Sequence, residues 1–442
     1  MPAAVSYSRP SSPTKGITKF TNCRLIKGDK LIEQDLWISS QTGKIIRSQE
    51  AFYSNHVIPD QVFDLGGRII SPGLIDVQLN GAFKFDFSAI PDGDIAEYGE
   101  GVRRVNKSLV RTGVTSYLPT VTSQRSEVYQ KALPYLAPSS HLRIPENGSE
   151  ILGAHVEGPF ISPTKNGIHN TSVLQSVQNG FEDLEACYGA ENLRSTPKAA
   201  GSLVSRPPAV KIITAAPEIG NMLSLIPEIT SRGIVYSIGH SEATYEEASA
   251  ASAAGAKMIT HLFNAMRPLH HRNPGIFGVL GKAENVPRPF FGVISDGIHL
   301  HPTTVKIAFN AYPEGFILVT DAMPLVGLPD GIYEWTNGDR IVKKGPHLTL
   351  EGTDKIAGSS VTLIECVSNF LNWTGASIPE AISAVTAHPA SMLGLEGVKG
   401  TLSSDGDADL VVLDESHDQG RISLSVNQVW KFGSKVFDVL EQ

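Results

Sequence analysis

Apolar and polar positions alternate in blocks along most of the chain. Short apolar runs that end in polar residues are separated by longer segments with helical periodicity, such as 94–112, 221–232 and 242–254. This alternation is typical of parallel strands joined by helices, and about eight such units predict a closed barrel. The apolar runs lie at 68–81, 114–120, 151–159, 210–214, 234–241, 257–261, 290–299 and 315–322.

The two ends of the chain show a different pattern. Strand-like runs at 20–26, 34–38 and 44–46 are separated by Gly, Lys and Asp turns, and short strands return at 406–414 and 426–430. No helical segments separate the strands within either group, so the ends predict a small all-β unit that the barrel interrupts.

We therefore predict an α/β fold with a (β/α)8 TIM-like barrel and a small β-sandwich domain formed from both chain termini. The barrel is expected over 71–395, the sandwich over 17–70 plus 396–442, and a flexible tail over 1–16. Two segments with weaker patterns are interpreted as a surface loop and an insertion with some helix: 137–149 and 176–207.

Three further features concern the last part of the barrel. Residues 330–355 predict a β-hairpin excursion with its turn at Asn337-Gly338. A helix is expected from Lys355 through 372, and its Gly-containing start offers either ligand-binding amides or only a turn. The segment 378–393 predicts a helix broken at His388-Pro389.

Composition and charge narrow the function classes. The 442 residues carry a formal net charge of −8, which argues against a nucleic-acid partner or an anionic membrane surface. An acidic protein can still hold an anionic substrate in a locally basic pocket. The 3 cysteines are sparse, and no secretory or membrane-spanning run is present, so we expect a cytoplasmic protein.

Candidate chemistry lies where the apolar runs end. In a (β/α)8 barrel the carboxyl ends of the strands meet at one face, where the active site is built. After Thr260-His261 the chain continues into a polar loop that reaches Arg272, which predicts an anion-binding loop beside one strand-end histidine. The polar residues at these strand ends are Gln78, Asn80, Glu157, His240, His261, His299 and Asp321.

Glu157, His240 and His261 bring one carboxylate and two imidazoles from three strands, a ligand set typical of hydrolytic zinc sites. A single histidine in such a place is more often structural, and Asp321 alone is more often a helix cap. So many polar strand ends at one face favour the catalytic interpretation, with Asp321 as general base. His155 shares a strand face with Glu157, and a satisfied core histidine is its more ordinary interpretation.

Several motifs carry a resemblance to a known family. Pro72-Gly73-Leu74-Ile75-Asp76 and the terminal Gly406–Leu410 run resemble the amidohydrolase superfamily. Within it, the chain from about residue 17 to 435 is similar to the N-acetylglucosamine-6-phosphate deacetylase family. The motifs that carry this closer resemblance are His155–Phe160, Ala216–Glu218, Gly239–Ser241, Thr260–Met266, Ser295–His299 and Val319–Ala322.

The resemblance implies a reaction and a cofactor. It implies hydrolysis of the acetamide of N-acetyl-D-glucosamine 6-phosphate to D-glucosamine 6-phosphate and acetate, in amino-sugar catabolism. Gln78 and Asn80 stand where the superfamily commonly has His-x-His, and amides bind metals poorly compared with imidazoles. We therefore expect one divalent metal per chain, Zn²⁺, held by Glu157, His240 and His261.

It also implies roles for individual residues. His299 would stabilise the oxyanion and contact the substrate, and Asp321 would move the proton. The remaining positions implied to bind the sugar phosphate are Gln78, Asn80, His169, Asn264, Ala265, Arg272, Ile356, Ala357 and Gly358. Barrels of this kind are often dimers, so we expect a homodimer in which Arg272 serves its own site or its partner's.

Two other functions remain open. A different amidohydrolase, such as a cyclic-amide hydrolase or a deaminase, would usually keep His-x-His and often a carboxylated lysine in place of Glu157. A catalytically inactive amidohydrolase-like assembly protein is the third candidate. The Gln78/Asn80 pair and Arg272 favour the sugar phosphate, and the intact Glu157 and Asp321 argue against an inactive barrel.

Overall fold

The structure is a computed structural model. It describes residues 15–48, 53, 56–139, 141–195, 206–281, 286–334 and 340–441. Residues 1–14 of the predicted tail and the predicted turn at Asn337-Gly338 lie outside the described residues. Within the described part of the chain, no helix is long and apolar enough to cross a membrane.

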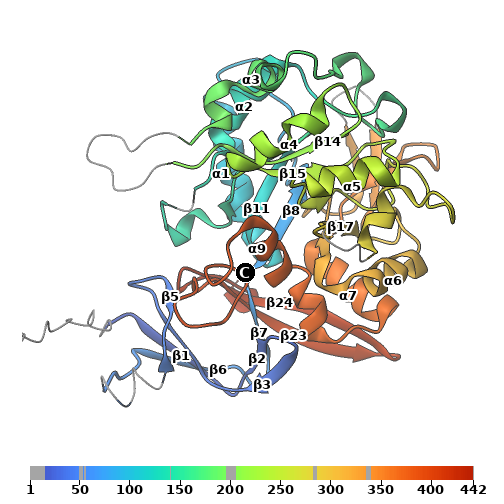
Figure 1. The fold of residues 1–442 in the computed structure, drawn as a ribbon. Coiled ribbons are helices and arrows are strands. Elements are labelled where there is room, and N and C mark those ends of the chain that lie inside the picture. The colour runs from blue at the N-terminus through green and yellow to red at the C-terminus, as the bar shows by residue number, and fades with distance from the viewer. Residues whose placement is uncertain are drawn as a thin grey trace, which may run out of the picture.

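A barrel of eight parallel strands forms the centre of the described structure (Figure 1). Its closure is made by a parallel bridge between Leu79 and Ala322, supported by a hydrogen bond from the Asp321 amide to the Gln78 carbonyl at 2.9 Å. The predicted (β/α)8 fold is therefore confirmed. In spatial order the strands are β8 (Leu74–Leu79), β11 (Val114–Val121), β13 (Ala154–Glu157), β14 (Val210–Ala215), β15 (Val235–Ile238), β16 (Met258–Ile259), β17 (Phe290–Ile294) and β18 (Phe316–Val319).

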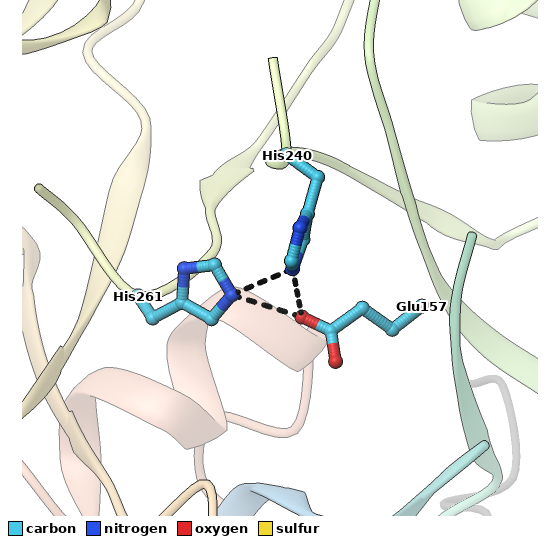
Figure 2. Close-up of side chains that lie close together, drawn as sticks. All are labelled: Glu157, His240 and His261. Carbon is cyan, nitrogen blue, oxygen red and sulfur yellow. Dashed lines mark hydrogen bonds and ion pairs between the residues drawn. The ribbon is translucent and has the colours of Figure 1, made fainter. Parts of the chain in front are cut away.

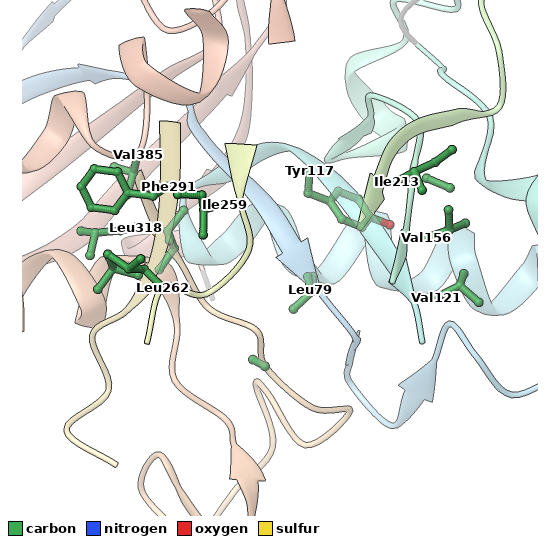
Figure 3. Close-up of a cluster of buried hydrophobic side chains, with 14 of the residues drawn as sticks. Leu79, Tyr117, Val121, Val156, Ile213, Ile259, Leu262, Phe291, Leu318 and Val385 are labelled. Atoms are coloured by element: carbon green, nitrogen blue, oxygen red, sulfur yellow. The ribbon is translucent and has the colours of Figure 1, made fainter. Parts of the chain in front are cut away.

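Alternation along the strands separates an inner core from an outer one. In β18, Ile317 and Val319 belong to the inner cluster, whereas Phe316 and Leu318 join the larger cluster beneath the helices. Figure 3 shows part of the outer cluster, with Leu318 beside Phe291 of the neighbouring strand. The inner cluster also includes Leu393 of α9 (Ala387–Leu393), so this helix closes one end of the barrel.

Local sequence explains where several helices begin and end. Capping boxes begin α5, α7 and α8: Thr244 with Glu247, Thr362 with Glu365, and Ser377 with Glu380. Gly375 ends α7 in the left-handed conformation, which glycine adopts at little cost. The other helices are α1 (Ala96–Leu109), α2 (Ser126–Ala132), α3 (Phe181–Tyr188), α4 (Met222–Ser231) and α6 (Pro302–Ala311), and the capped ones span Tyr245–Ala253, Leu363–Thr374 and Ile378–Ser383.

Both chain ends build two sheets around a shared core, as the predicted β-sandwich requires. Phe20 of one sheet and Trp430 of the other meet edge to face, with ring centroids 5.0 Å apart. One sheet has the order β5 (Lys44–Ile45), β4 (Leu36–Ser39), β1 (Ile17–Thr21) and β6 (Gln61–Asp64). The other has the order β25 (Ser434–Asp438), β24 (Arg421–Lys431), β23 (Leu410–Asp418), β7 (Ile69–Pro72), β2 (Arg24–Lys27) and β3 (Lys30–Glu33).

A buried ion cluster joins this terminal unit to the barrel. The ammonium groups of Lys399 and Lys431 both contact the carboxylates of Glu150 and Asp409, at 2.6 to 2.8 Å. Glu150 lies in β12 (Glu150–Ile151), which pairs with β11 of the barrel. All four side chains are at most 5% exposed, so each charge depends on the others for its solvation.

Two predictions about the late segments were wrong. The helix expected from Lys355 begins only at Leu363, because Ile356–Ser359 is strand β22, paired with β21 (His347–Leu350). The predicted hairpin excursion is present, since β19 (Gly331–Glu334) and β20 (Arg340–Lys344) pair antiparallel, and β21 and β22 extend it to a four-stranded sheet. The helix predicted over 378–393 is also broken at a different place. The break lies between α8 and α9, whereas His388-Pro389 lies inside α9.

Candidate active site

Glu157, His240 and His261 converge at the carboxyl end of the barrel (Figure 2). Glu157 Oε1 lies 3.2 Å from His240 Nε2 and 3.0 Å from His261 Nε2, and the two imidazole nitrogens are 3.0 Å apart. All three residues are at most 4% exposed. The predicted ligand set is therefore brought together from three strands.

The backbone turns both histidines toward the barrel axis. Strict alternation would place them outward, because Ile238 and Ile259 belong to the outer core and each lies two residues before one of the histidines. His240 and His261 instead have φ of 50° and 27°, and Asp321 has φ of 46°. Non-glycine residues rarely adopt this region, and such strain is typical of functional sites.

The chemistry of these side chains fits a bound metal. His240 Nδ1 donates to the Lys165 carbonyl at 2.7 Å, which leaves the Nε2 lone pair facing Glu157 and His261. Burial raises the pKa of Glu157, but the hydrogen bonds and charges of both histidines outweigh it and hold that pKa well below its usual range. Two imidazole nitrogens and an ionised carboxylate at such distances require a proton or a cation between them. The set suits a metal that prefers nitrogen and oxygen ligands.

The charge on His261 supports the same conclusion. Burial lowers the pKa of His261, but its hydrogen bond to Glu157 raises it more, and the resulting pKa is about 9. The site thus attracts positive charge strongly, and a metal would supply that charge in place of the proton.

Asp321 lies beside this cluster and is held by two amides. Asn80 Nδ2 donates to Asp321 Oδ1 at 2.8 Å, and Gln78 Nε2 donates both to that oxygen at 3.1 Å and to Glu157 Oε1 at 3.0 Å. Burial and the charge of Glu157 raise the pKa of Asp321 to about 6. The amides thus contact the two carboxylates with their NH₂ groups, and their buried carbonyl oxygens have no partner within the described residues.

His299 is held by Asp296. Its Nδ1 lies 2.7 Å from Asp296 Oδ2, and the side chain is 23% exposed whereas that of Asp296 is fully buried. Burial lowers the pKa of His299, but the hydrogen bond and charge of Asp296 raise it more, so the net shift is upward. The charge of Asp321 also raises this pKa, and the charge of His261 lowers it.

His169 packs against the cluster of Glu157, His240 and His261. Ser123 contributes both its amide and its hydroxyl to His169 Nδ1, at 3.1 and 2.7 Å, and His169 Nε2 lies 3.9 Å from Glu157 Oε2. Its ring centroid is 4.5 Å from that of His240. Burial lowers the pKa of His169 to about 3, so the ring is neutral and turns its Nε2–H toward the second carboxylate oxygen.

Three further residues predicted to bind the substrate are Asn264, Ala265 and Arg272. Asn264 has a buried side-chain oxygen with no partner in the described part of the chain, and Ala265 has φ of 48°. Arg272 is exposed, and its guanidinium makes no hydrogen bond or ion pair to any described residue. It is not held within the cluster of ligands.

The strand β22 approaches the site through Met323. The Met323 amide donates to the Ser359 carbonyl at 2.9 Å, and a Cβ on Gly358 would lie 2.6 Å from Met323 Cγ. Met323 follows Asp321 by two residues and its sulfur lies 4.0 Å from Asn80 Nδ2. Ile356 is exposed and Ala357 half-buried, so the β22 edge borders the site without entering it.

Three groups support these side chains, and their sequence signals differ. The side chain of His155 spans from the Val77 carbonyl at 2.9 Å to the Thr214 hydroxyl at 2.6 Å, so it is a satisfied core histidine beneath the site. The Lys165 carbonyl that orients His240 is a backbone group and has no sequence signal. Asp296 has one, since it lies three residues before His299 in the Ser295–His299 motif.

Comparisons with known proteins show the family to which the chain is similar. The amidohydrolase family model matches residues 69–440. N-acetylglucosamine-6-phosphate deacetylase of Homo sapiens is 40% identical over 94% of this chain and 96% of its own length. The crystal structure of the Thermotoga maritima deacetylase of the same name has a TM-score of 0.70 and 28% identity, covering 95% of this chain and 99% of its own. A Mycobacterium smegmatis deacetylase variant solved with N-acetyl-D-glucosamine-6-phosphate has a TM-score of 0.72 and 26% identity, covering 95% and 98%.

Proposed function

The chain belongs to the N-acetylglucosamine-6-phosphate deacetylases of the amidohydrolase family, and from this membership we propose the reaction that it catalyses. It hydrolyses the acetamide of N-acetyl-D-glucosamine 6-phosphate to D-glucosamine 6-phosphate and acetate, a step of amino-sugar catabolism. The observation that carries the proposal is the buried convergence of Glu157, His240 and His261 beside Asp321.

Glu157, His240 and His261 would hold a single divalent metal, which when bound supplies the Lewis acidity that polarises a carbonyl and acidifies water. Zinc is the metal proposed, because two imidazoles and one carboxylate with an open position are its usual catalytic ligand set. A second metal is disfavoured, since the Gln78 and Asn80 amides already donate to the nearby carboxylates.

Asp321 carries the proton in this proposal. It accepts the proton that water gives up on attacking the acetamide carbon, and it returns that proton to the nitrogen as the C–N bond breaks. A pKa raised to about 6 suits both tasks near neutral pH. The Gln78 and Asn80 amides keep Oδ1 in place, so the other oxygen remains available to the water.

His299 assists by donating a hydrogen bond from Nε2 to the carbonyl oxygen as negative charge develops on it. The raised pKa of His299 favours the charged, donating form of the ring. Nδ1 is already engaged with Asp296, so Nε2 is the nitrogen available to the substrate.

Several residues are proposed to bind the sugar phosphate. Arg272 offers the planar fork that suits a phosphate, and its exposed guanidinium is free among the described residues to meet one. The unpartnered side-chain oxygen of Asn264 supports a sugar contact. The other proposed contacts are Gln78, Asn80, His169, Ala265, Ile356, Ala357 and Gly358.

A homodimer and a cytoplasmic location complete the proposal. The exposed Arg272 can serve its own site or that of a second copy, which sedimentation velocity and mixed-variant complementation would distinguish. All three cysteines are free and buried, as expected for a protein of a reducing compartment.

One assay tests the function. The metal-loaded protein is expected to release acetate from N-acetylglucosamine 6-phosphate and to act much more weakly on the unphosphorylated sugar. Parallel reactions with a cyclic amide and with an aminated base cover the two other amidohydrolase chemistries. Hydrolysis of either in preference to the sugar phosphate would contradict the proposal, and no turnover of any of them would favour an inactive assembly protein.

A further inference from the structure

Asp296 is built as a rigid acceptor. Its Oδ1 accepts the backbone amides of Ile298 at 2.8 Å and His299 at 2.9 Å, and its Oδ2 lies 2.7 Å from His299 Nδ1. The side chain is fully buried, and Gly297 between these residues has φ of 77°. Three donors thus fix both carboxylate oxygens in a turn at the carboxyl end of β17.

We propose that Asp296 is a positioning residue, which keeps a proton on Nδ1 of His299 and aims Nε2 at the substrate carbonyl as the donor of a charged imidazolium. The inference rests on the proposed deacetylase function for the identity of that carbonyl. It goes beyond that function because Asp296 itself touches neither substrate nor metal in this role.

The tautomer follows from hydrogen-bond chemistry. An ionised carboxylate only accepts, so His299 Nδ1 must carry a proton. A neutral ring of that tautomer has a lone pair on Nε2 and cannot donate to a developing oxyanion. The ring becomes a donor at Nε2 only when it is charged, and the buried carboxylate at 2.7 Å stabilises that charge.

Other charged and titratable groups face the same pair. Asp321 favours the charged ring and His261 opposes it, both through space. From α7, burial raises the pKa of the Cys366 thiol and the charge of Asp296 raises it further, and the Trp373 ring lies 3.5 Å from the position of a Cβ on Gly297. The direct hydrogen bond to Asp296 outweighs these through-space effects, and none of these other groups contacts His299 Nδ1 by a hydrogen bond within the described residues.

Asp296→Asn keeps the turn that positions His299 but removes the negative charge beside its ring. The asparagine oxygen can still accept both backbone amides, so the turn is kept. Its NH₂ replaces Oδ2 and donates to His299 Nδ1, which moves the ring proton to Nε2 and leaves the ring neutral. The variant therefore keeps a donor toward the substrate but loses its charge.

The first measurement is the ring tautomer in the zinc-loaded protein, read by two-bond ¹H–¹⁵N correlation spectra of ¹⁵N-histidine protein. His299→Gln identifies the His299 signal by its loss. At high pH, where the ring is neutral, the proton is expected on Nδ1 in the wild type and on Nε2 in Asp296→Asn. A wild-type ring with its proton on Nε2 would overturn the inference.

The second measurement is kinetic. Asp296→Asn is expected to lower kcat about tenfold with little change in KM, because a charged donor is replaced by a neutral one. The alkaline decline of kcat that follows loss of charge on His299 should disappear in this variant. His301→Asn is the matched control, since His301 caps α6 by accepting from the Thr303 amide at 3.2 Å and asparagine caps equally well.

A double variant separates positioning from a structural role. If Asp296 acts through His299, adding Asp296→Asn to His299→Gln should lower kcat no further. Multiplicative losses in the double variant would overturn the inference. If the wild type releases no acetate from the sugar phosphate, the proposed function fails, whereas the tautomer of His299 in the same protein still decides whether Asp296 holds the ring as inferred.

Discussion

Replacing Asp321 by Asn tests the centre of the proposed mechanism with the least structural change. In the wild type, Asp321 Oδ1 accepts from Asn80 Nδ2 at 2.8 Å and from Gln78 Nε2 at 3.1 Å. The asparagine oxygen can occupy the same position and accept the same two hydrogen bonds. The three proposed metal ligands are untouched. The variant should therefore fold and bind metal, but it cannot take a proton from water.

The expected loss is large. General-base catalysis contributes about 10²–10⁴-fold in rate, so turnover of Asp321→Asn should fall by at least about a hundredfold. In the wild type the same carboxyl sets the acidic limb, with kcat/KM falling as pH drops below its pKa. The midpoint should be no higher than about 6, since a bound cation would favour the ionised carboxylate.

Asp321→Asn should also stabilise the metal-free protein. Burial raises the pKa of Asp321 from 3.8 to about 6, so the folded state binds this proton more tightly than the unfolded state. Stability is then lost as pH rises from about 3.8 to about 6, and the whole cost, roughly 3 kcal/mol, is present above that window. Asparagine carries no charge, so the variant should avoid this cost at pH 7.5.

Three measurements on one preparation check this reasoning: acetate release, metal content by elemental analysis, and thermal unfolding after chelation. The expected pattern is a lost activity, an unchanged metal content of one per chain, and a Tm of the metal-free variant that is higher by a few degrees. Near-normal turnover would refute Asp321 as the base. A lower Tm than the chelated wild type would refute the buried-charge cost.

The other predictions concern the metal, the phosphate and the buried ion cluster. Glu157→Gln should leave the protein with substoichiometric metal by elemental analysis, because it removes the only carboxylate of the Glu157/His240/His261 set; full metal content would contradict the ligand assignment. Arg272→Ala should raise KM at least about tenfold for the phosphorylated sugar alone, with Arg272→Lys intermediate and metal content unchanged. Lys399→Met should lower the free energy of unfolding by on the order of 3 kcal/mol in denaturant titrations, since it leaves Glu150 and Asp409 with one ammonium fewer; an unchanged midpoint would show that the cluster contributes nothing.

Some of the site follows directly from strand periodicity. Glu157 lies two residues after His155 on β13, and both point inward, so alternation alone predicts its side of the sheet. The positions of His240 and His261 do not follow from alternation. Each of these histidines itself has a positive φ, which the pattern of apolar and polar residues does not predict. Their role was predicted from residue type and from position after an apolar run.

The mistaken helix at 355–360 has a comparable cause. The Gly-Ser-Ser stretch before the apolar residues of α7 is compatible with a helix start, and the actual capping box, Thr362 with Glu365, lies a few residues later. What makes Ile356–Ser359 a strand is its pairing with β21, whose residues lie 7 and 12 positions earlier, and the propensity of the segment itself does not contain that pairing.

The sequence by itself determined the barrel, the terminal β unit and the identity of the converging side chains. These depend on periodicity and on which residues end each strand, and both are local properties. Only the tertiary structure decided which nitrogen of His240 and of His299 faces the centre. The Lys165 carbonyl orients His240 across 75 residues of sequence, and the Asp296 carboxylate orients His299 across 3. Proton positions depend on such partners, and partners are chosen by the fold.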